Sequence, residues 1–275
     1  MSKISKNKDL VLNNGVEIPF VGLGTYQMRG YEVEKAVEVA LEAGYRHFDT
    51  AAIYGNEKEI GDTLRNLGVK RENIFITSKV WNDDQGFENT MNAIDISLDK
   101  LQTDFVDLYL VHWPLPDKRK STWEAMIDIY DGRKARSIGV SNYTSDHIEE
   151  LMKYSSITPV VNQIEITPFL YQKDLVSNCE SFDIKIEAYS PLLKGKKLDD
   201  PNIVEIGKKY NKSSAQVLIR WSLEKGFIVL PKSANPDRIK ENIDVFDFEL
   251  SPEDMSLLDS LDSNIRISWD PSELD

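Results

Sequence analysis

Short apolar runs alternate with longer amphipathic segments along the 275 residues of the chain. A short apolar run suits a strand buried on both faces, whereas apolar residues recurring every three or four positions indicate a helix with one buried face. The runs of strand length are FVGLG (20–24), RHFDT (46–50), IFITSKV (74–80), FVDLYLVHW (105–113), ARSIGVSN (135–142), VVNQIEI (160–166), KIEAYS (185–190) and FIVLPKS (227–233). The pattern therefore predicts eight strands.

Segments with helical spacing lie between and after these strands. EVEKAVEVALEAG predicts a helix that ends at Gly44, and STWEAMIDIY begins with Ser121 and Glu124, which predicts a capping box at the start of a helix. The same spacing recurs in ENTMNAIDISLDKL (88–101), SDHIEELMKY (145–154), KSSAQVLIRWSLEKG (212–226) and SPEDMSLLDSL (251–261).

The alternation predicts an α/β fold, the (β/α)8 TIM barrel. Parallel strands need crossover connections, which are usually helices, and eight such strands close a barrel. No linker or change in composition divides the chain, so we expect a single domain over residues 1–275. Within residues 9–18, the Asn14–Gly15 pair predicts a hairpin that covers the N-terminal end of the barrel. Residues 262–275 form a short C-terminal tail.

The amino-acid composition limits the kinds of ligand and partner that we expect for this chain. The formal net charge of −13 opposes binding to nucleic acid and to anionic membranes, so clustered cations must hold any phosphate-bearing ligand. The single Cys179 cannot form an intramolecular disulfide, and MSKISKNKDL lacks the apolar run of a signal peptide. The three histidines lack the spacing of a zinc site. We therefore expect a cytoplasmic protein that binds neither metal nor membrane, and we take a monomer as the expected assembly state.

Polar residues occur where the predicted strands end, which is where a barrel of this kind carries its chemistry. Asp49, Tyr54, Lys79 and His112 follow neighbouring strands. Singly, these residues fit a helix cap, loop packing, a surface lysine and a core histidine. Their occurrence together favours a site, because buried Asp, Lys and His side chains need one another's charge.

Three segments resemble the signatures of the aldo-keto reductases, in the correct order. They are GYRHFDTAAIYGNEKEIG (44–61), IDIYDGRKARSIGVSNY (127–143) and LPKSANPDRIKENI (230–243). The resemblance is to the compact bacterial-type members of the family. It implies the same barrel, NADPH as the cofactor, a carbonyl compound as the substrate, and a catalytic tetrad of Asp49, Tyr54, Lys79 and His112.

The chemistry of these residue types agrees with that implication. Reduction of a carbonyl needs a hydride and a proton, and a tyrosine phenol with a pKa of about 10 is a weak acid near neutrality unless a cation stabilises its phenolate. Lys79 supplies such a cation, and Asp49 compensates its charge. His112 would hydrogen-bond the substrate oxygen.

The resemblance also implies a set of cofactor contacts. The nicotinamide end would be held by Ser141, Asn142 and Gln163, with Tyr189 stacked on the ring, and Ser190 and Leu192 would line the pyrophosphate path. The 2′-phosphate would be held by Lys232, Ser233 and Arg238, and the adenine by Glu241 and Asn242. Gly24 and Thr25 are further candidates at the end of the first strand. The cations at Lys232, Arg238 and Lys240 favour NADPH over NADH.

Three other interpretations compete with this one. A doubly wound dehydrogenase would use Gly22 and Gly24, but Gln27 stands where the third glycine should be. Tyr54 and Lys58 have the spacing of short-chain dehydrogenases, but a glycine-rich partner motif is missing. A non-catalytic NADPH-binding barrel with a regulatory or structural role is the third alternative, and the intact tetrad argues against it.

The sequence limits the substrate to a broad class. Tyr26, Trp81 and Trp113 should line the pocket, which indicates a partly apolar or planar substrate. The loops PLPDKRKS (114–121) and PLLKGKKLDDPN (191–202) are short, as is the tail IRISWDPSELD. We therefore expect small aldehydes, ketoaldehydes or keto-sugars as substrates.

Overall fold

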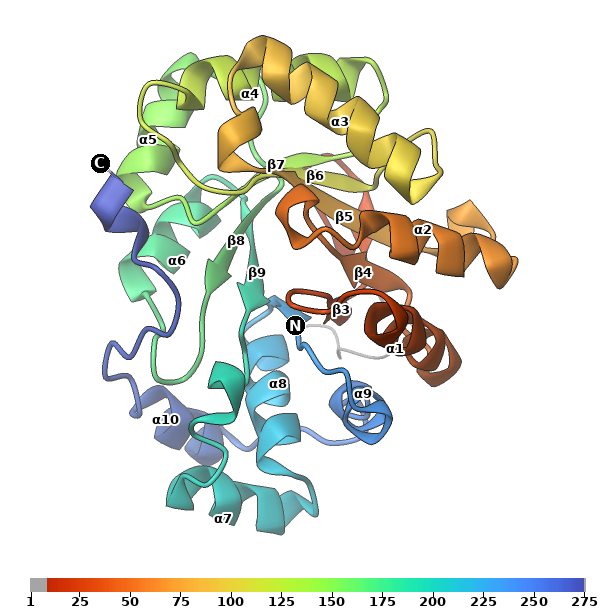
Figure 1. Cartoon of the computed structure of the whole chain (residues 1–275). Helices are drawn as coiled ribbons and strands as arrows, with labels where there is room; N and C mark the ends of the chain where they lie inside the picture. The colour runs from red at the N-terminus through yellow and green to blue at the C-terminus, as the bar shows by residue number, and fades with distance from the viewer. Residues whose placement is uncertain (1–8, 275) are drawn as a thin grey trace.

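Eight parallel strands form a closed barrel in the computed structural model, which describes residues 9–274 (Figure 1). Each strand pairs with the next one along the chain, and the first meets the last through a bridge between Val21 and Val229. The predicted (β/α)8 barrel is therefore confirmed. The strands are β3 (Gly22–Gly24), β4 (His47–Asp49), β5 (Phe75–Val80), β6 (Leu108–Val111), β7 (Ile138–Ser141), β8 (Val161–Glu165), β9 (Lys185–Tyr189) and β10 (Ile228–Leu230).

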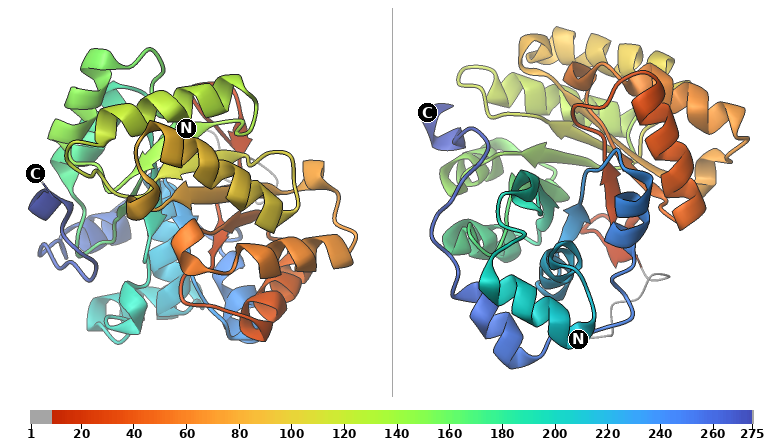
Figure 2. Two further views of the ribbon diagram at one scale, coloured as in Figure 1. Left: turned by 45° about the horizontal axis from the view of Figure 1, so that its top comes forward. Right: turned by 60° about the horizontal axis from the view of Figure 1, so that its bottom comes forward.

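Helices surround the barrel on its outer side (Figures 1 and 2). In the first of them, Val33, Ala36 and Val37 are buried against the barrel, and Gly44 ends the helix with a left-handed φ of 98°. The helices are α1 (Tyr31–Ala43), α2 (Glu57–Asn66), α3 (Phe87–Leu101), α4 (Arg119–Asp131), α5 (Ser145–Tyr154), α6 (Lys173–Ser181), α7 (Pro201–Tyr210), α8 (Ser214–Glu224), α9 (Pro236–Ile243) and α10 (Pro252–Asp259).

The predicted capping box at Ser121 is wrong. Helix α4 begins at Arg119, so Ser121 lies within its first turn, and the Ser121 hydroxyl donates to the carbonyl oxygen of Lys118 instead of capping a backbone N–H. A capping box does occur at the start of α5, where Thr144 and His147 satisfy each other's backbone N–H groups.

The predicted hairpin is confirmed and covers the N-terminal end of the barrel. Strands β1 (Leu10–Val11) and β2 (Glu17–Ile18) pair in antiparallel fashion around a turn in which Gly15 has a φ of 84°. The Asn13 amide donates to the carbonyl oxygen of Pro159, 3.0 Å away, just before β8. Leu12 and Ile18 pack on residues of the barrel interior, so the hairpin closes this end.

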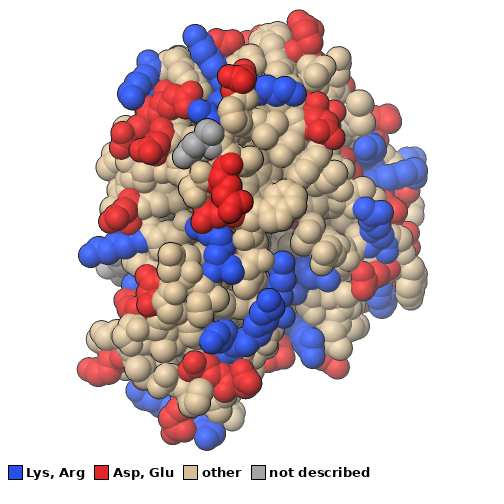
Figure 3. Space-filling model, turned by 60° about the vertical axis from the view of Figure 1, so that its left-hand side comes forward, with Lys and Arg blue, Asp and Glu red and all other residues tan. Residues whose placement is uncertain are grey.

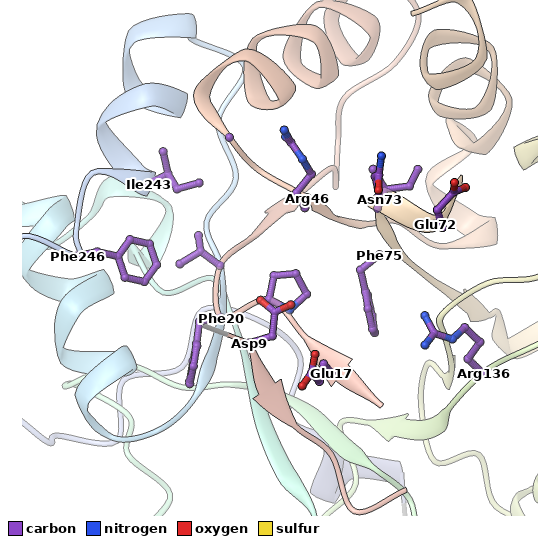
Figure 4. A pocket seen from close by; sticks show the side chains of 14 residues that line it. Asp9, Glu17, Phe20, Arg46, Glu72, Asn73, Phe75, Arg136, Ile243 and Phe246 are labelled. Carbon is purple, nitrogen blue, oxygen red and sulfur yellow. The ribbon is translucent and has the colours of Figure 1, made fainter. Parts of the chain in front are cut away.

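A cavity of about 220 Å³ lies beside the hairpin (Figure 4). Its lining includes the carboxylates of Asp9 and Glu17 and the guanidinium groups of Arg46 and Arg136. Burial, followed by the charge of Glu17, raises the pKa of Asp9. Because this cavity is at the end where the strands begin, it is separate from the polar residues at the strand ends.

The tail after α10 is tied to the barrel by its backbone. The carboxylate of Glu165, at the end of β8, accepts hydrogen bonds from the N–H groups of Ile267 and Ser268 at 2.8 and 2.9 Å. Closer to α10, the N–H groups of Ser263 and Ile265 donate to the carbonyl oxygen of Phe169. These bonds hold the tail beside the mouth of the barrel, the end at which the strands finish.

Candidate active site

The strand register brings three members of the expected tetrad together at the mouth. Asp49 ends β4, Lys79 lies near the end of the adjacent β5, and His112 follows β6. Tyr54 ends a short 3-10 turn, η1 (Ala52–Tyr54), after which Gly55 adopts a left-handed φ of 65° and the chain enters α2. This turn carries the phenol back over the strand ends.

Lys79 is fully buried, and its ammonium group is fully paired. Its Nζ atom lies 2.8 Å from each carboxylate oxygen of Asp49 and 2.8 Å from the carbonyl oxygen of Thr50. These three contacts match the three protons of an ammonium group. A buried charge is tolerated only when it is paired in this way, so Asp49 holds Lys79 in place rather than capping a helix.

The phenol of Tyr54 lies close to this ion pair. Lys79 Nζ is 5.1 Å from the centre of the Tyr54 ring. Burial, followed by the negative charge of Asp49, raises the pKa of Tyr54 above its ordinary value. The expected stabilisation of the phenolate by Lys79 does not dominate here, because Asp49 neutralises the lysine. The phenol therefore keeps its proton near neutrality.

His112 faces the same space as an uncharged imidazole. Burial, followed by the charge of Lys79, lowers the pKa of His112 well below its ordinary value. Its ring makes edge contacts with the rings of Tyr54 and Trp81, at centroid distances of 5.8 and 5.1 Å. Within residues 9–274, Nδ1 of His112 has no hydrogen-bond partner. A neutral imidazole here can hydrogen-bond a neutral oxygen atom without adding charge.

A chain of hydrogen bonds joins the residues expected to hold the nicotinamide end of the cofactor. The Tyr189 hydroxyl donates to Oδ1 of Asn142 at 2.8 Å, and the Asn142 amide donates to the carbonyl oxygen of His112 at 3.0 Å. The Ser141 hydroxyl donates to the carbonyl oxygen of Gln163 at 2.8 Å. The ends of β7, β8 and β9 are thereby fixed next to His112.

Gln163 connects this chain with the ion pair. Its Nε2 atom lies 2.8 Å from Oδ2 of Asp49 and 2.7 Å from Oε2 of Glu187. The amide has two N–H protons, one for each carboxyl group, and its oxygen is left to accept other bonds. Sequence reasoning missed Glu187, although the alternation within β9 places Glu187 on the same face as Tyr189.

Gly24 and Thr25 belong to the wall of the site at the end of β3. The Thr25 hydroxyl is buried and donates to the carbonyl oxygen of Asp49 at 2.8 Å. A side chain at Gly24 would come within 3.3 Å of the carbonyl oxygen of Leu230, so the backbone of β10 passes closely here.

The residues expected around the phosphates and the adenine follow β9 and β10. In α9, the side chain of Asn235 accepts from the N–H groups of Asp237 and Arg238, so the first turn of this helix is capped. Ser233 and Asn242 are buried, Ser190, Leu192 and Glu241 are half-buried, and Lys232, Arg238 and Lys240 are exposed. The exposed cations are free of ion pairs among the described residues.

Positively charged side chains cluster on part of the surface (Figure 3), although the chain is acidic overall. On the face shown in Figure 3, several Lys and Arg side chains lie close together in the lower half. The net charge of −13 therefore does not exclude an anionic ligand from every part of the surface.

Aromatic side chains surround the tetrad. The Tyr26 ring is half-exposed and lies 5.1 Å from the Tyr54 ring, while Trp81 contacts His112. Trp113 is buried and meets Trp269 of the tail at a centroid distance of 5.7 Å. Sequence reasoning missed Trp269, whose only signal was an aromatic residue within a polar tail.

Comparisons with known proteins show the family to which the chain belongs. The model of the aldo/keto reductase family matches residues 21–263. A glyoxal reductase of Bacillus subtilis is 49% identical over 97% of this chain and 98% of its own length. A 9,11-endoperoxide prostaglandin H2 reductase of Trypanosoma cruzi is 45% identical, over 95% of this chain and 94% of its own.

A solved structure shows the same architecture with a cofactor present. The Bombyx mori aldo-keto reductase in complex with NADP superposes with a TM-score of 0.88 and 39% identity, over 96% of this chain and 95% of that one. The chain described here belongs to the aldo/keto reductase family and is an oxidoreductase of that family. Within residues 9–274, no helix has the length and apolar character needed to cross a membrane.

Proposed function

We propose that this protein reduces small aldehydes, ketoaldehydes or keto-sugars to alcohols with NADPH, using Tyr54 as the proton donor. The observation that carries the proposal is the meeting of a protonated phenol, a neutral imidazole and a buried Lys79–Asp49 pair at the mouth of the barrel.

NADPH, when bound, supplies the hydride that reaches the carbonyl carbon. The phenolic O–H bond of Tyr54 breaks as its proton moves to the carbonyl oxygen, which leaves an alcohol and a phenolate. Lys79 stabilises the developing phenolate, since its charge lies 5.1 Å from the ring centre. His112 hydrogen-bonds the same oxygen and keeps the carbonyl within reach of the phenol.

The chain's own residues fit NADPH at both of its ends. The free oxygen of the Gln163 amide suits the N–H groups of a carboxamide, beside Ser141 and Asn142, with the Tyr189 ring next to them. Lys232 and Arg238, which form no ion pair with another residue of the described part of the chain, suit a 2′-phosphate, together with Ser233. Ser190 and Leu192 would line the pyrophosphate path, and Glu241 and Asn242 would contact the adenine. The NADP complex of the Bombyx mori relative supports this choice of cofactor.

The aromatic walls support a small or planar substrate. The rings of Tyr26 and Trp81 contact those of Tyr54 and His112, respectively, and Trp113 directly follows His112 in the chain. The glyoxal reductase relative supports a small reactive aldehyde. The relative named for a prostaglandin shows that family membership by itself does not limit substrate size. The preference for small substrates therefore depends on the loops and the tail of this chain.

A screen of NADPH oxidation tests the proposal. Methylglyoxal, substituted benzaldehydes and keto-sugars should each drive a fall in NADPH absorbance, with small aldehydes among the best substrates. A chain that binds NADPH but oxidises it with none of these compounds would contradict the proposal and favour the non-catalytic, regulatory or structural barrel.

A further inference from the structure

The barrel interior holds a second buried carboxyl group, that of Glu187, beside the ion pair. Its side chain is completely buried, and its Oε2 atom lies 2.7 Å from Nε2 of Gln163. Within residues 9–274, its Oε1 atom has no hydrogen-bond partner. Nε2 of His47 lies 3.7 Å from Oε1, beyond hydrogen-bond distance. A buried carboxylate with one hydrogen bond is costly, and this one needs a proton or a cation.

The neighbouring cation, Lys79, already pairs with Asp49. Lys79 donates its three hydrogen bonds to Asp49 and Thr50, so Glu187 receives none of them. Because Gln163 donates to both Asp49 and Glu187, the two carboxyl groups lie on either side of one nitrogen atom. Two carboxylates in such a position repel each other, so one of them favours its protonated form.

The groups that face Glu187 come from four neighbouring segments: His47 and Asp49 of β4, Lys79 of β5, Gln163 of β8 and Tyr54 of η1. Burial, followed by the charge of Asp49, raises the pKa of Glu187 to about 8. Burial and then Lys79 lower the pKa of His47 to about 3. Near neutrality, Glu187 therefore holds its proton and His47 is uncharged.

The charge on Glu187 also affects the pKa of Tyr54. The negative charge of Glu187, after burial, Asp49 and Tyr26, is among the causes that raise the pKa of Tyr54. While Glu187 is protonated, Lys79 and Asp49 leave the interior close to neutral. Once Glu187 ionises, the interior carries one uncompensated negative charge, which disfavours a phenolate at Tyr54.

We infer that Glu187 is a positioning residue, whose protonated carboxyl group fixes the Gln163 amide and whose ionisation in alkaline solution weakens Tyr54 as a proton donor. The inference deepens the proposed reduction and rests on it for the role of Tyr54. Glu187 acts through Gln163, Asp49 and the charge of the interior, and it needs no contact with substrate.

Glu187→Gln tests the inference, because glutamine keeps the shape and an oxygen acceptor for Gln163 but cannot ionise. Glu187→Asp keeps an ionisable group and serves as the conservative variant. Glu57→Gln is the matched control, because Glu57 is a buried carboxylate that contacts Ser78 and Lys100 rather than Gln163.

The first measurement is infrared spectroscopy of each protein against pH, without cofactor or substrate. Wild type should show the carbonyl stretch of a protonated carboxylic acid at pH 6, and the band should disappear as the pH passes about 8. Glu57→Gln should keep this band and Glu187→Gln should lose it. A band that is absent from wild type at pH 6, or unchanged in Glu187→Gln, would overturn the protonated state.

The second measurement is the pH profile of kcat/KM for aldehyde reduction. At pH 6, Glu187→Gln should stay within about threefold of wild type, whereas above pH 8 it should exceed wild type by more than about threefold. Glu187→Asp and Glu57→Gln should each retain the alkaline fall. If wild type and Glu187→Gln are both active and their pH profiles of kcat/KM superimpose, the positioning role of Glu187 is overturned while the proposed function stands. A wild type that reduces no carbonyl would overturn it together with the proposed function, and the infrared band would distinguish the two failures.

Discussion

Both carboxylate oxygens of Asp49 lie 2.8 Å from Nζ of Lys79, and this Nζ atom lies 5.1 Å from the centre of the Tyr54 ring. The pair is buried, and the carbonyl oxygen of Thr50 takes the remaining proton of the ammonium group. Lys79 therefore acts on Tyr54 through its charge rather than through a hydrogen bond in this arrangement. In the proposed mechanism the same pair would contribute both to the reactivity of the site and to the stability of the fold.

Lys79→Met should cost both activity and stability. It leaves Asp49 as a buried carboxylate without its cation, and breaking a buried pair costs about 3–5 kcal/mol of unfolding free energy. Reduction should fall at least about a hundredfold, because the developing phenolate then loses the positive charge of Lys79. Denaturant unfolding and NADPH oxidation measure the two effects.

The double variant Lys79→Met with Asp49→Asn separates these effects. It removes the orphaned charge, so it should recover much of the lost stability while reduction stays low. Recovery of reduction along with stability would show that the charge of Lys79 is not needed for the chemistry.

Arg238→Ala should weaken NADPH binding much more than NADH binding. Arg238 is exposed on the first turn of α9, and a hydrogen bond between charged groups contributes about 1.5–3 kcal/mol, or roughly tenfold to a hundredfold in affinity. NADPH binding should also weaken as salt is added. Fluorescence titration with each cofactor measures this, and Lys153→Ala, which removes an exposed cation of α5, is the control. Equal losses for the two cofactors would show that Arg238 does not contact the 2′-phosphate.

Trp113→Ala should reduce kcat/KM for benzaldehydes more than for methylglyoxal. An aromatic pair contributes about 0.5–1.5 kcal/mol beyond its buried area, so the aromatic substrates should lose roughly a further two- to tenfold. Trp269→Ala should show the same preference more weakly, because Trp269 is mostly exposed and contacts Trp113 from the tail. Steady-state kinetics with both substrates measure these changes in kcat/KM. A steroid turned over far better than every small aldehyde would contradict the proposed substrate class.

The stability of the protein should depend on Glu187 with a definite sign. The ordinary pKa of this carboxyl is 4.5 and the folded value is about 8, so between these values the folded state binds more protons than the unfolded state. Stability therefore falls as the pH rises through this window. Glu187→Gln should not show this loss of stability. The difference in unfolding free energy between Glu187→Gln and wild type should therefore grow, in favour of the variant, by up to about 1.4 kcal/mol for each unit that the pH rises. Denaturant unfolding at several pH values measures the gain, and a constant difference across the window would contradict it.

Much of the fold, and the clustering of the residues of the expected tetrad, could be predicted because both depend on local pattern. The strands fall within the predicted runs, and Asp49, Lys79 and His112 follow from where those runs end. Parallel pairing then places these residues side by side without further information. Ser121 shows the limit of such reasoning, since the start of α4 depends on how the preceding loop is held and not on a local motif.

The residues that were missed act through contacts between distant segments. Glu187 shares a face with Tyr189, but its importance depends on Gln163 of another strand and on the fact that Lys79 is already paired. Trp269 contacts Trp113 because the carboxylate of Glu165 holds the backbone of the tail. Hydrogen bonds from the backbone cannot be recognised from the pattern of side chains in the sequence.

Tyr54→Phe gives the most direct test of the central claim that Tyr54 is the proton donor. The change removes the hydroxyl and keeps the ring in contact with Tyr26 and His112. NADPH oxidation with methylglyoxal should fall by far more than about tenfold, which corresponds to about 1.4 kcal/mol of barrier, while NADPH affinity stays within about threefold. Turnover within about tenfold of wild type would contradict the claim.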